Sequence, residues 1–209
     1  GQGTADFNEE GLVEDALAVI ESSGAKRVVP VALSHSGWVA IRLRQRLGER
    51  IPKLVLIDWL VFEAPPPFLE TLRDMQSPGK WRPTVDRLFS RWLDGVDNTR
   101  LVRFVLEEMG SCGFEMWARA AREIGASYAR YGSPLKALSN LTPPVPVLHL
   151  YAQPGDPEYL KAQQSFAASN PWFQVRKLEA QSHFPMFEVT DEMAKAITEF
   201  TESRTRKVA

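Results

Sequence analysis

The chain has 209 residues, and its 25 lysines and arginines nearly balance its 26 aspartates and glutamates. Because no block of like charge occurs before the short basic tail 204–207, nucleic acid is not an expected partner. Hydrophobic residues make up 44% of the chain, enough for a sizeable core in one domain or a domain with an insertion. No stretch approaches the ~20 apolar residues of a membrane span and no signal peptide leads the chain, so we expect a cytoplasmic protein without a membrane partner.

Cysteine and histidine are both scarce. The single cysteine, Cys112, permits no internal disulfide, fits a reducing compartment and has no nucleophile motif around it, so we interpret it as a partly buried residue between helices. The chain has three histidines and no His-x-Asp or His-x-Glu pair, too few ligands for a facial triad or a zinc site. We therefore expect no metal.

A sharp turn at Ser34 is the feature around which the rest of the pattern is arranged. The apolar run 28–33 ends in a small polar cluster, and an amphipathic stretch follows at once, which predicts a buried strand, a tight turn and a helix. Ala32 and Ser36 are small, as the neighbours of a strained serine turn must be. The usual glycines of the G-x-S-x-G pattern are missing, and the alternative is an ordinary turn in which serine caps the helix.

Apolar strands and amphipathic helices alternate along most of the chain. After a loop over residues 1–7, the first predicted helix has Glu9 and Glu10 in its first turn and ends at Gly24. The later predicted helices are 38–47, 157–168 and 193–200. The predicted strands after the first are 54–57, 146–151 and 173–178. Uninterrupted apolar strands joined through helices are typical of a parallel sheet, whose functional groups lie at the carboxyl ends of the strands. The fold class is therefore α/β, with a mostly parallel sheet.

The segment 62–140 has a different character, because several helical stretches follow a proline run with no strand between them. We interpret this segment as a helical cap inserted into a core made of 1–61 and 141–209. Each of its large aromatic residues is by default a packing residue between helices. A cap over strand ends nevertheless encloses an apolar pocket, which suits a flat aromatic or an otherwise hydrophobic ligand. These aromatic residues are Phe68, Trp81, Phe89, Trp92, Phe114, Trp117 and Tyr128.

Three polar residues follow the ends of separate strands: Ser34, Asp58 and His183. Their chain order of serine, acid and histidine is that of the α/β-hydrolase fold, although the acid comes earlier than is common there. Paired with Asp58, His183 would be a competent general base. His149 lies inside an apolar strand, and we interpret it as a core residue.

Five short segments of the sequence together resemble the cofactor-independent 3-hydroxy-4(1H)-quinolone 2,4-dioxygenases. These enzymes have the α/β-hydrolase fold, cleave a heteroaromatic ring with O₂ and release carbon monoxide. The resemblance runs from Gly3 to the closing helix. The segments are Ser34-His35-x-Gly37-Trp38, Leu56-Ile57-Asp58-Trp59-Leu60, Arg91-Trp92-Leu93-Asp94-Gly95, Gly132-Ser133-Pro134 and Ser182-His183-Phe184-Pro185.

This resemblance implies a role for each matching residue. His183 resembles the base of the family and Asp58 the acid that orients it. Ser34 resembles a serine that hydrogen-bonds the substrate and is not acylated, and Trp92 a pocket wall. His35 would offer its backbone N–H to the substrate carbonyl. The implied partners are a quinolone and O₂, and the implied products are an N-acylanthranilate and CO.

Two departures from the family pattern are visible. Leu33 occupies the position at which the methyl-quinolone enzyme has a histidine, which implies a more hydrophobic pocket. Such a pocket favours a substrate with a longer 2-alkyl chain, as in the alkyl-quinolone quorum-sensing signals. The family also has N-terminal strands that precede the first residue of this chain. We therefore expect an unpaired sheet edge beside the predicted strand 28–33, and either a separate N-terminal fragment of the same protein bound there or a poorly stable domain.

Two other functions remain open from the residues alone. A serine esterase or amidase would use the same Ser34, Asp58 and His183, with Ser34 as nucleophile. A non-catalytic ligand receptor could be built on the same scaffold, since fold does not fix function, although the intact Asp58 and His183 pair speaks against it.

Overall fold

A four-stranded parallel sheet forms the centre of the computed structural model, which describes residues 8–203. The predicted loop 1–7 and the basic tail 204–207 lie outside the described residues. The strand order within the sheet follows the chain order, so each connection crosses over to the next strand. The predicted α/β class with a parallel sheet is confirmed. The strands are β1 (Val31–Leu33), β2 (Leu54–Ile57), β3 (Val147–Tyr151) and β4 (Phe173–Lys177).

Helices cover both faces of this sheet. The successive side chains of β2 point to opposite faces, and all of them are apolar, so both faces must be buried. Leu54 and Leu56 pack into a cluster with α1, α2, α7 and α8, whereas Val55 and Ile57 pack against α9. The core helices are α1 (Glu9–Ser22), α2 (Ser36–Leu47), α7 (Pro134–Ser139), α8 (Pro157–Ser169) and α9 (Thr190–Glu202), with short 3₁₀ turns η1 (Gly48–Arg50) and η3 (Pro185–Phe187).

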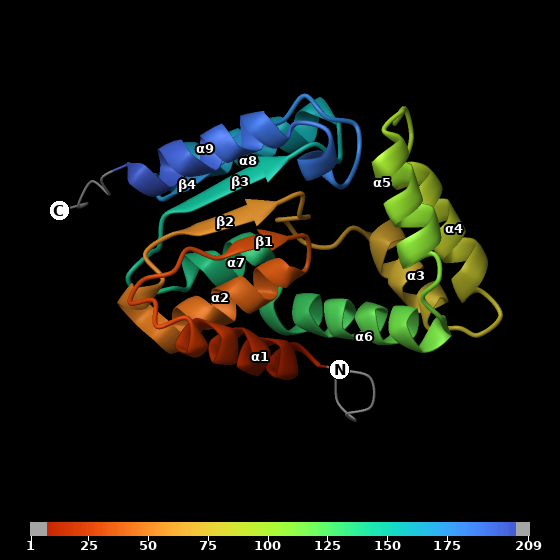
Figure 1. Cartoon of the computed structure of the whole chain (residues 1–209), viewed down its shortest axis with the longest axis horizontal. Helices are drawn as coiled ribbons and strands as arrows, with labels where there is room; N and C mark the ends of the chain where they lie inside the picture. The colour runs from red at the N-terminus through yellow and green to blue at the C-terminus, as the bar shows by residue number, and fades with distance from the viewer. Residues whose placement is uncertain (1–7, 204–209) are drawn as a thin grey trace.

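The remaining helices gather beyond the carboxyl ends of the strands, where the arrowheads of β2 and β3 point (Figure 1). They have an apolar cluster of their own, in which the rings of Phe89 and Trp117 lie 5.5 Å apart, so these aromatics pack between helices as predicted. Phe184, from the loop after β4, is buried in the same cluster. These helices are α3 (Pro66–Met75), α4 (Trp81–Trp92), α5 (Thr99–Arg103), the π-helix η2 (Phe104–Met109) and α6 (Phe114–Tyr131).

The last helix of the predicted cap, α7, packs with the core and not with the cap. Leu135 and Leu138 are buried in the cluster that contains β2 and α2, and the N–H of Leu135 donates to the carbonyl of Val61 at 3.0 Å. Figure 1 shows α6 running from the cap back toward the core. The division of the chain at residues 62 and 140 stays a prediction.

β1 is shorter than the predicted strand 28–33. Pro30 has no N–H to donate, and the ladder with β2 begins at Val31. Within residues 8–203, β1 pairs only with β2, and Val31 is half exposed. The expected binding of a separate N-terminal fragment to this edge stays a prediction. No helix in the described part of the chain is long and apolar enough to cross a membrane.

Candidate active site

The turn after β1 has the strained geometry that the sequence predicts. Ser34 has a φ of 52°, in the left-handed region that non-glycine residues rarely adopt. The Ser36 hydroxyl donates to the carbonyl of Leu33 at 2.6 Å and ties the turn together. A Cβ at Gly37 would lie 2.2 Å from the Trp59 ring, so only glycine permits this close approach of α2 to the next strand end. The Ser34 hydroxyl is thereby held above the sheet edge.

Asp58 follows β2 in a second left-handed turn, with a φ of 46°. Its side chain is only 1% exposed, and both carboxylate oxygens have partners. Oδ1 accepts the backbone N–H of Ala152 at 2.6 Å and that of Gln153 at 2.9 Å, while Oδ2 lies 2.6 Å from Nδ1 of His183. The loop after β3 therefore fixes the acid, and the acid fixes the histidine.

His183 lies in the loop after β4, with its side chain 15% exposed. Because Asp58 accepts at Nδ1, the Nε2 atom is the one left to take a proton. The loop is held by Glu188, whose carboxylate accepts the N–H of Gln181 at 3.1 Å and both the N–H and the hydroxyl of Ser182. Glu188 thus fixes the loop that carries His183.

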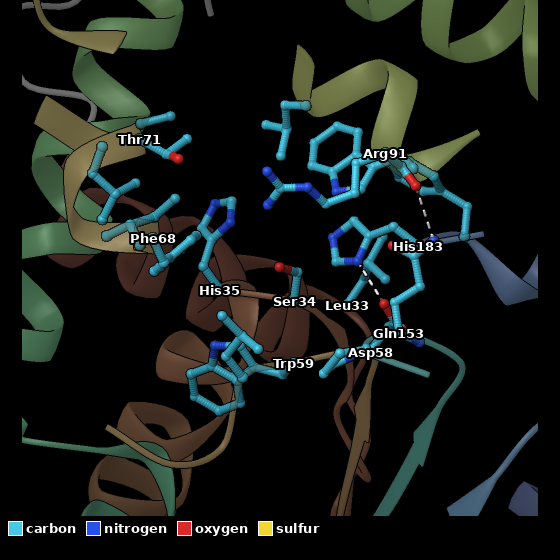
Figure 2. A pocket seen from close by; sticks show the side chains of 18 of the residues that line it. Leu33, Ser34, His35, Asp58, Trp59, Phe68, Thr71, Arg91, Gln153 and His183 are labelled. Carbon is cyan, nitrogen blue, oxygen red and sulfur yellow. Dashed lines mark hydrogen bonds and ion pairs between the residues drawn. The ribbon is translucent and has the colours of Figure 1, made fainter. Parts of the chain in front are cut away.

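A cavity of about 1040 Å³ lies between the sheet edge and the cap, and Ser34 and His183 both line it. Leu33 and Trp92 form parts of its apolar wall, and the Trp92 ring stacks on the His183 ring with centroids 4.9 Å apart and planes 17° apart. All six residues predicted for the site, the four above together with His35 and Asp58, line this one cavity. Figure 2 labels all of these residues except Trp92 and shows them around the same space. Among the described residues, no hydrogen bond joins Ser34 to His183.

His35 is the N-cap residue of α2, and its imidazole faces the cavity (Figure 2). Enclosure away from bulk water lowers the pKa of His35, and the nearby His183 lowers it further, because a charged imidazole would be poorly solvated there and repelled. His35 is therefore neutral near pH 7. Its backbone N–H lies at the positive end of α2, a position suited to an oxygen that gains negative charge.

His149 has the structural role expected of it. It is fully buried in β3, with Nδ1 2.6 Å from Oε1 of Gln163 and Nε2 accepting the N–H of Trp59 at 3.3 Å. Burial lowers its pKa to about 4, so the ring is neutral at pH 7. Cys112 is half-buried and packs against the cap cluster. Within residues 8–203, no three His, Cys, Asp or Glu side chains gather closely enough to hold a metal ion.

Two residues at the site were not predicted. Arg91 precedes Trp92 at the end of α4, and its side chain extends into the cavity (Figure 2). Gln153 lies just past the end of β3, beside Asp58. The rule that functional groups follow parallel strands could have found Gln153, whereas Arg91 stood inside a segment of which only Trp92 was assigned a role.

Crossover connections, a parallel sheet and a serine on a strained elbow beside a His–Asp pair define an α/β-hydrolase-fold protein. The model of the family described as "Alpha/beta hydrolase family" matches residues 1–196. Within this fold family, the chain belongs to the 3-hydroxy-4-quinolone dioxygenases, as its relatives show.

The relatives cover most of the chain. A 2-heptyl-3-hydroxy-4(1H)-quinolone dioxygenase of Mycobacteroides abscessus is 33% identical over 90% of this chain and 71% of its own length. The 1H-3-hydroxy-4-oxoquinoline 2,4-dioxygenase of Pseudomonas putida is 35% identical over 96% of this chain and 76% of its own. A solved structure of an AqdC variant with its substrate, the Pseudomonas quinolone signal, superposes with a TM-score of 0.90 at 32% identity, over 97% of this chain and 76% of that one. The predicted fold, family and enzyme class are confirmed.

Proposed function

We propose that the protein cleaves a 2-alkyl-3-hydroxy-4(1H)-quinolone with O₂, releasing CO and leaving an N-acylanthranilate. The observation that carries this proposal is the His183–Asp58 pair, which opens onto a largely apolar cavity of about 1040 Å³. Such a cavity has room for a bicyclic ring and an alkyl chain. Membership of the quinolone dioxygenases supplies the class of substrate.

His183 acts as the general base. Its Nε2 takes the proton of the substrate's 3-hydroxyl, and Asp58 stabilises the imidazolium that forms. The Ser34 hydroxyl and the His35 backbone N–H, both at the turn after β1, align the substrate by donating hydrogen bonds to its oxygens. Deprotonation makes the ring electron-rich, so the organic anion itself supplies the electrons that O₂ needs.

The reaction needs no further reductant, because every atom of the substrate and of O₂ is found in the two products. One atom of O₂ bonds to C2 of the ring and the other closes onto C4, after which C3 leaves with its own oxygen as CO. C2 becomes the amide carbonyl and C4 the carboxylate of the product. Leu33, Trp92 and the cap helices exclude water from the cavity, which protects the peroxide intermediate.

Arg91 provides a positive charge for the anion. Its guanidinium extends into the cavity and forms no ion pair with a carboxylate among the described residues, although Asp94 also lines the cavity. Arg91 is an exposed residue at the wall of the cavity, where its guanidinium can form charge-assisted hydrogen bonds to an anionic ligand. We assign Arg91 to the deprotonated substrate and to the carboxylate of the product.

The apolar wall of the cavity contacts the 2-alkyl chain of the substrate and so determines which chain length is preferred. Leu33 presents a branched aliphatic side chain to the cavity beside Ser34 and offers no hydrogen bond there. We propose that a long alkyl chain is preferred over a methyl group for this reason. The single cysteine of the chain fits a cytoplasmic site of action.

A comparison of two alanine variants tests the role of the base. His183→Ala is expected to lower kcat by about 100-fold or more, because general bases contribute on that scale, while Ser34→Ala keeps an appreciable part of the activity. Oxygen-dependent loss of the quinolone measures both.

The strained elbow at Ser34 also favours a second candidate, a serine esterase or amidase. Equal and total losses in the two alanine variants would support that mechanism, as would covalent labelling of Ser34 by a fluorophosphonate probe. Tight quinolone binding with no turnover would indicate a receptor.

A further inference from the structure

Gln153 connects three segments that come together only in the folded chain. Its backbone N–H donates to Oδ1 of Asp58 at 2.9 Å. Its side-chain Nε2 donates to the carbonyl of Gln181 at 2.6 Å, in the loop that carries His183, and to the carbonyl of Arg91 at 3.2 Å, in the last turn of α4. We call these three hydrogen bonds the Gln153 clasp. It joins the acid, the histidine loop and the cap.

An amide is the side-chain group that suits this position. The two N–H bonds on Nε2 are directed at two carbonyl oxygens that belong to different segments. A carboxylate of the same shape would place negative oxygens against those carbonyls, and a thioether would leave them without a donor. The geometry therefore distinguishes glutamine from glutamate and methionine, although all three have nearly the same volume.

The cap residue next to the clasp is Trp92, whose ring stacks on His183 at 4.9 Å. Phe184 also touches Trp92, edge to face with centroids 5.4 Å apart, and anchors the histidine loop in the cap cluster. The face of an indole attracts a cation within about 6 Å of its centroid, so it stabilises His183 once this residue holds a proton. Small tilts or shifts of α4 would weaken that contact.

We propose that Gln153 is a positioning residue, which aligns the Trp92 indole with the His183 ring by holding the end of α4 to the histidine loop. Gln153 acts through Trp92 and does not touch the substrate's reacting atoms. The proposal rests on the proposed function for its kinetic consequence, since it treats His183 as the base. The alignment itself is independent of which reaction His183 serves.

A double-mutant cycle tests whether Gln153 acts through Trp92. Gln153→Met in the intact protein is expected to lower kcat about tenfold, the scale of a cation–π contact in a desolvated site, with KM changed by less than about threefold. In a Trp92→Leu background, the same Gln153→Met change is expected to lower kcat by less than about threefold. Gln164→Met is the matched control, because this glutamine is exposed on α8.

The outcome that overturns the proposal is an equal fold loss of kcat from Gln153→Met in both backgrounds, or no loss in either. Melting temperatures of all variants separate alignment from unfolding. Gln153→Glu provides a second variant, with a loss expected to be at least as large, because its carboxylate repels both carbonyls.

An NMR measurement separates this proposal from the proposed function. The ring current of Trp92 shifts the imidazole protons of His183, whose signals are assigned by their absence in His183→Ala. In Gln153→Met, we expect these signals to move toward those of Trp92→Leu, with no substrate present. Unchanged signals would overturn the proposal, whereas changed signals in a protein that cleaves no quinolone would leave the alignment intact and reject only the proposed reaction.

Discussion

Arg91 places a permanent positive charge in a cavity whose walls are largely apolar. Arg91→Gln is therefore expected to weaken anaerobic binding of a 2-alkyl-3-hydroxy-4-quinolone about fivefold, because a contact between an exposed guanidinium and an anion is worth ~1 kcal/mol. Binding of the same quinolone without the 3-hydroxyl is expected to change by less than about threefold, because it offers no such anion. Titration of Trp fluorescence under argon measures both dissociation constants.

Arg87→Gln is the matched control for this experiment. Arg87 lies on the same helix, where its guanidinium donates to the Thr84 hydroxyl at 2.9 Å, and it does not line the cavity. The two variants have the same change in net charge. Equal weakening of both quinolones by Arg91→Gln would contradict the role of Arg91 as a partner of the anion.

The positions of single site residues can be predicted from the sequence where they follow the end of a parallel strand. Ser34, Asp58 and His183 each follow a strand end, and parallel strands end at one edge of the sheet, so their meeting could be predicted without coordinates. Gln153 also follows a strand end, so the same rule could have found it. Arg91 could not be found in this way, because its place depends on where α4 lies over the sheet, and this is decided by packing between cap and core.

His149 links three elements, because it lies in β3, contacts Gln163 of α8 and accepts the N–H of Trp59 after β2. Its folded pKa of about 4 is below the unfolded value of 6.5. Above pH 7 both states are neutral, and as the pH falls below 6.5 only the unfolded state takes up the proton. The free energy of unfolding should therefore drop by about 2 kcal/mol from this group between pH 7 and pH 5.

Urea unfolding of wild type and His149→Gln at the two pH values measures this contribution. The variant is expected to be less stable at pH 7, because the contact to Trp59 is disturbed, but its stability should depend less on pH by about 2 kcal/mol. His35 titrates in both proteins, so its contribution cancels in the difference. An identical pH dependence in the two proteins would contradict the assignment.

Elements were predicted well where periodicity decides them and less well where tertiary contacts do. β2 has the predicted bounds, because four apolar residues in a row have no alternative to burial. β1 begins three residues later than predicted, because pairing with β2 does not extend to the start of the apolar run. The helical character of α7 was expected, but its packing on the core is set by Leu135 and Leu138, whose partners lie far away in sequence.

At the scale of the whole molecule, the cap and the core meet at the reaction centre. Trp92 and Phe184 are in edge-to-face contact across this boundary, and Phe184 directly follows His183 in the chain. The cap therefore covers the sheet edge and contacts the loop that carries His183. This arrangement suits a reaction whose peroxide intermediate must not meet water.

The most direct test of the central claim is a turnover in ¹⁸O₂ with a 2-alkyl-3-hydroxy-4(1H)-quinolone, with headspace gas and product analysed by mass spectrometry. We expect unlabelled CO, because that carbon leaves with the substrate's own oxygen, and an N-acylanthranilate that carries both atoms of one O₂ molecule. An anaerobic control should yield neither product. Absence of CO in air, or a product without label from O₂, would contradict the assignment of this protein as a ring-cleaving dioxygenase.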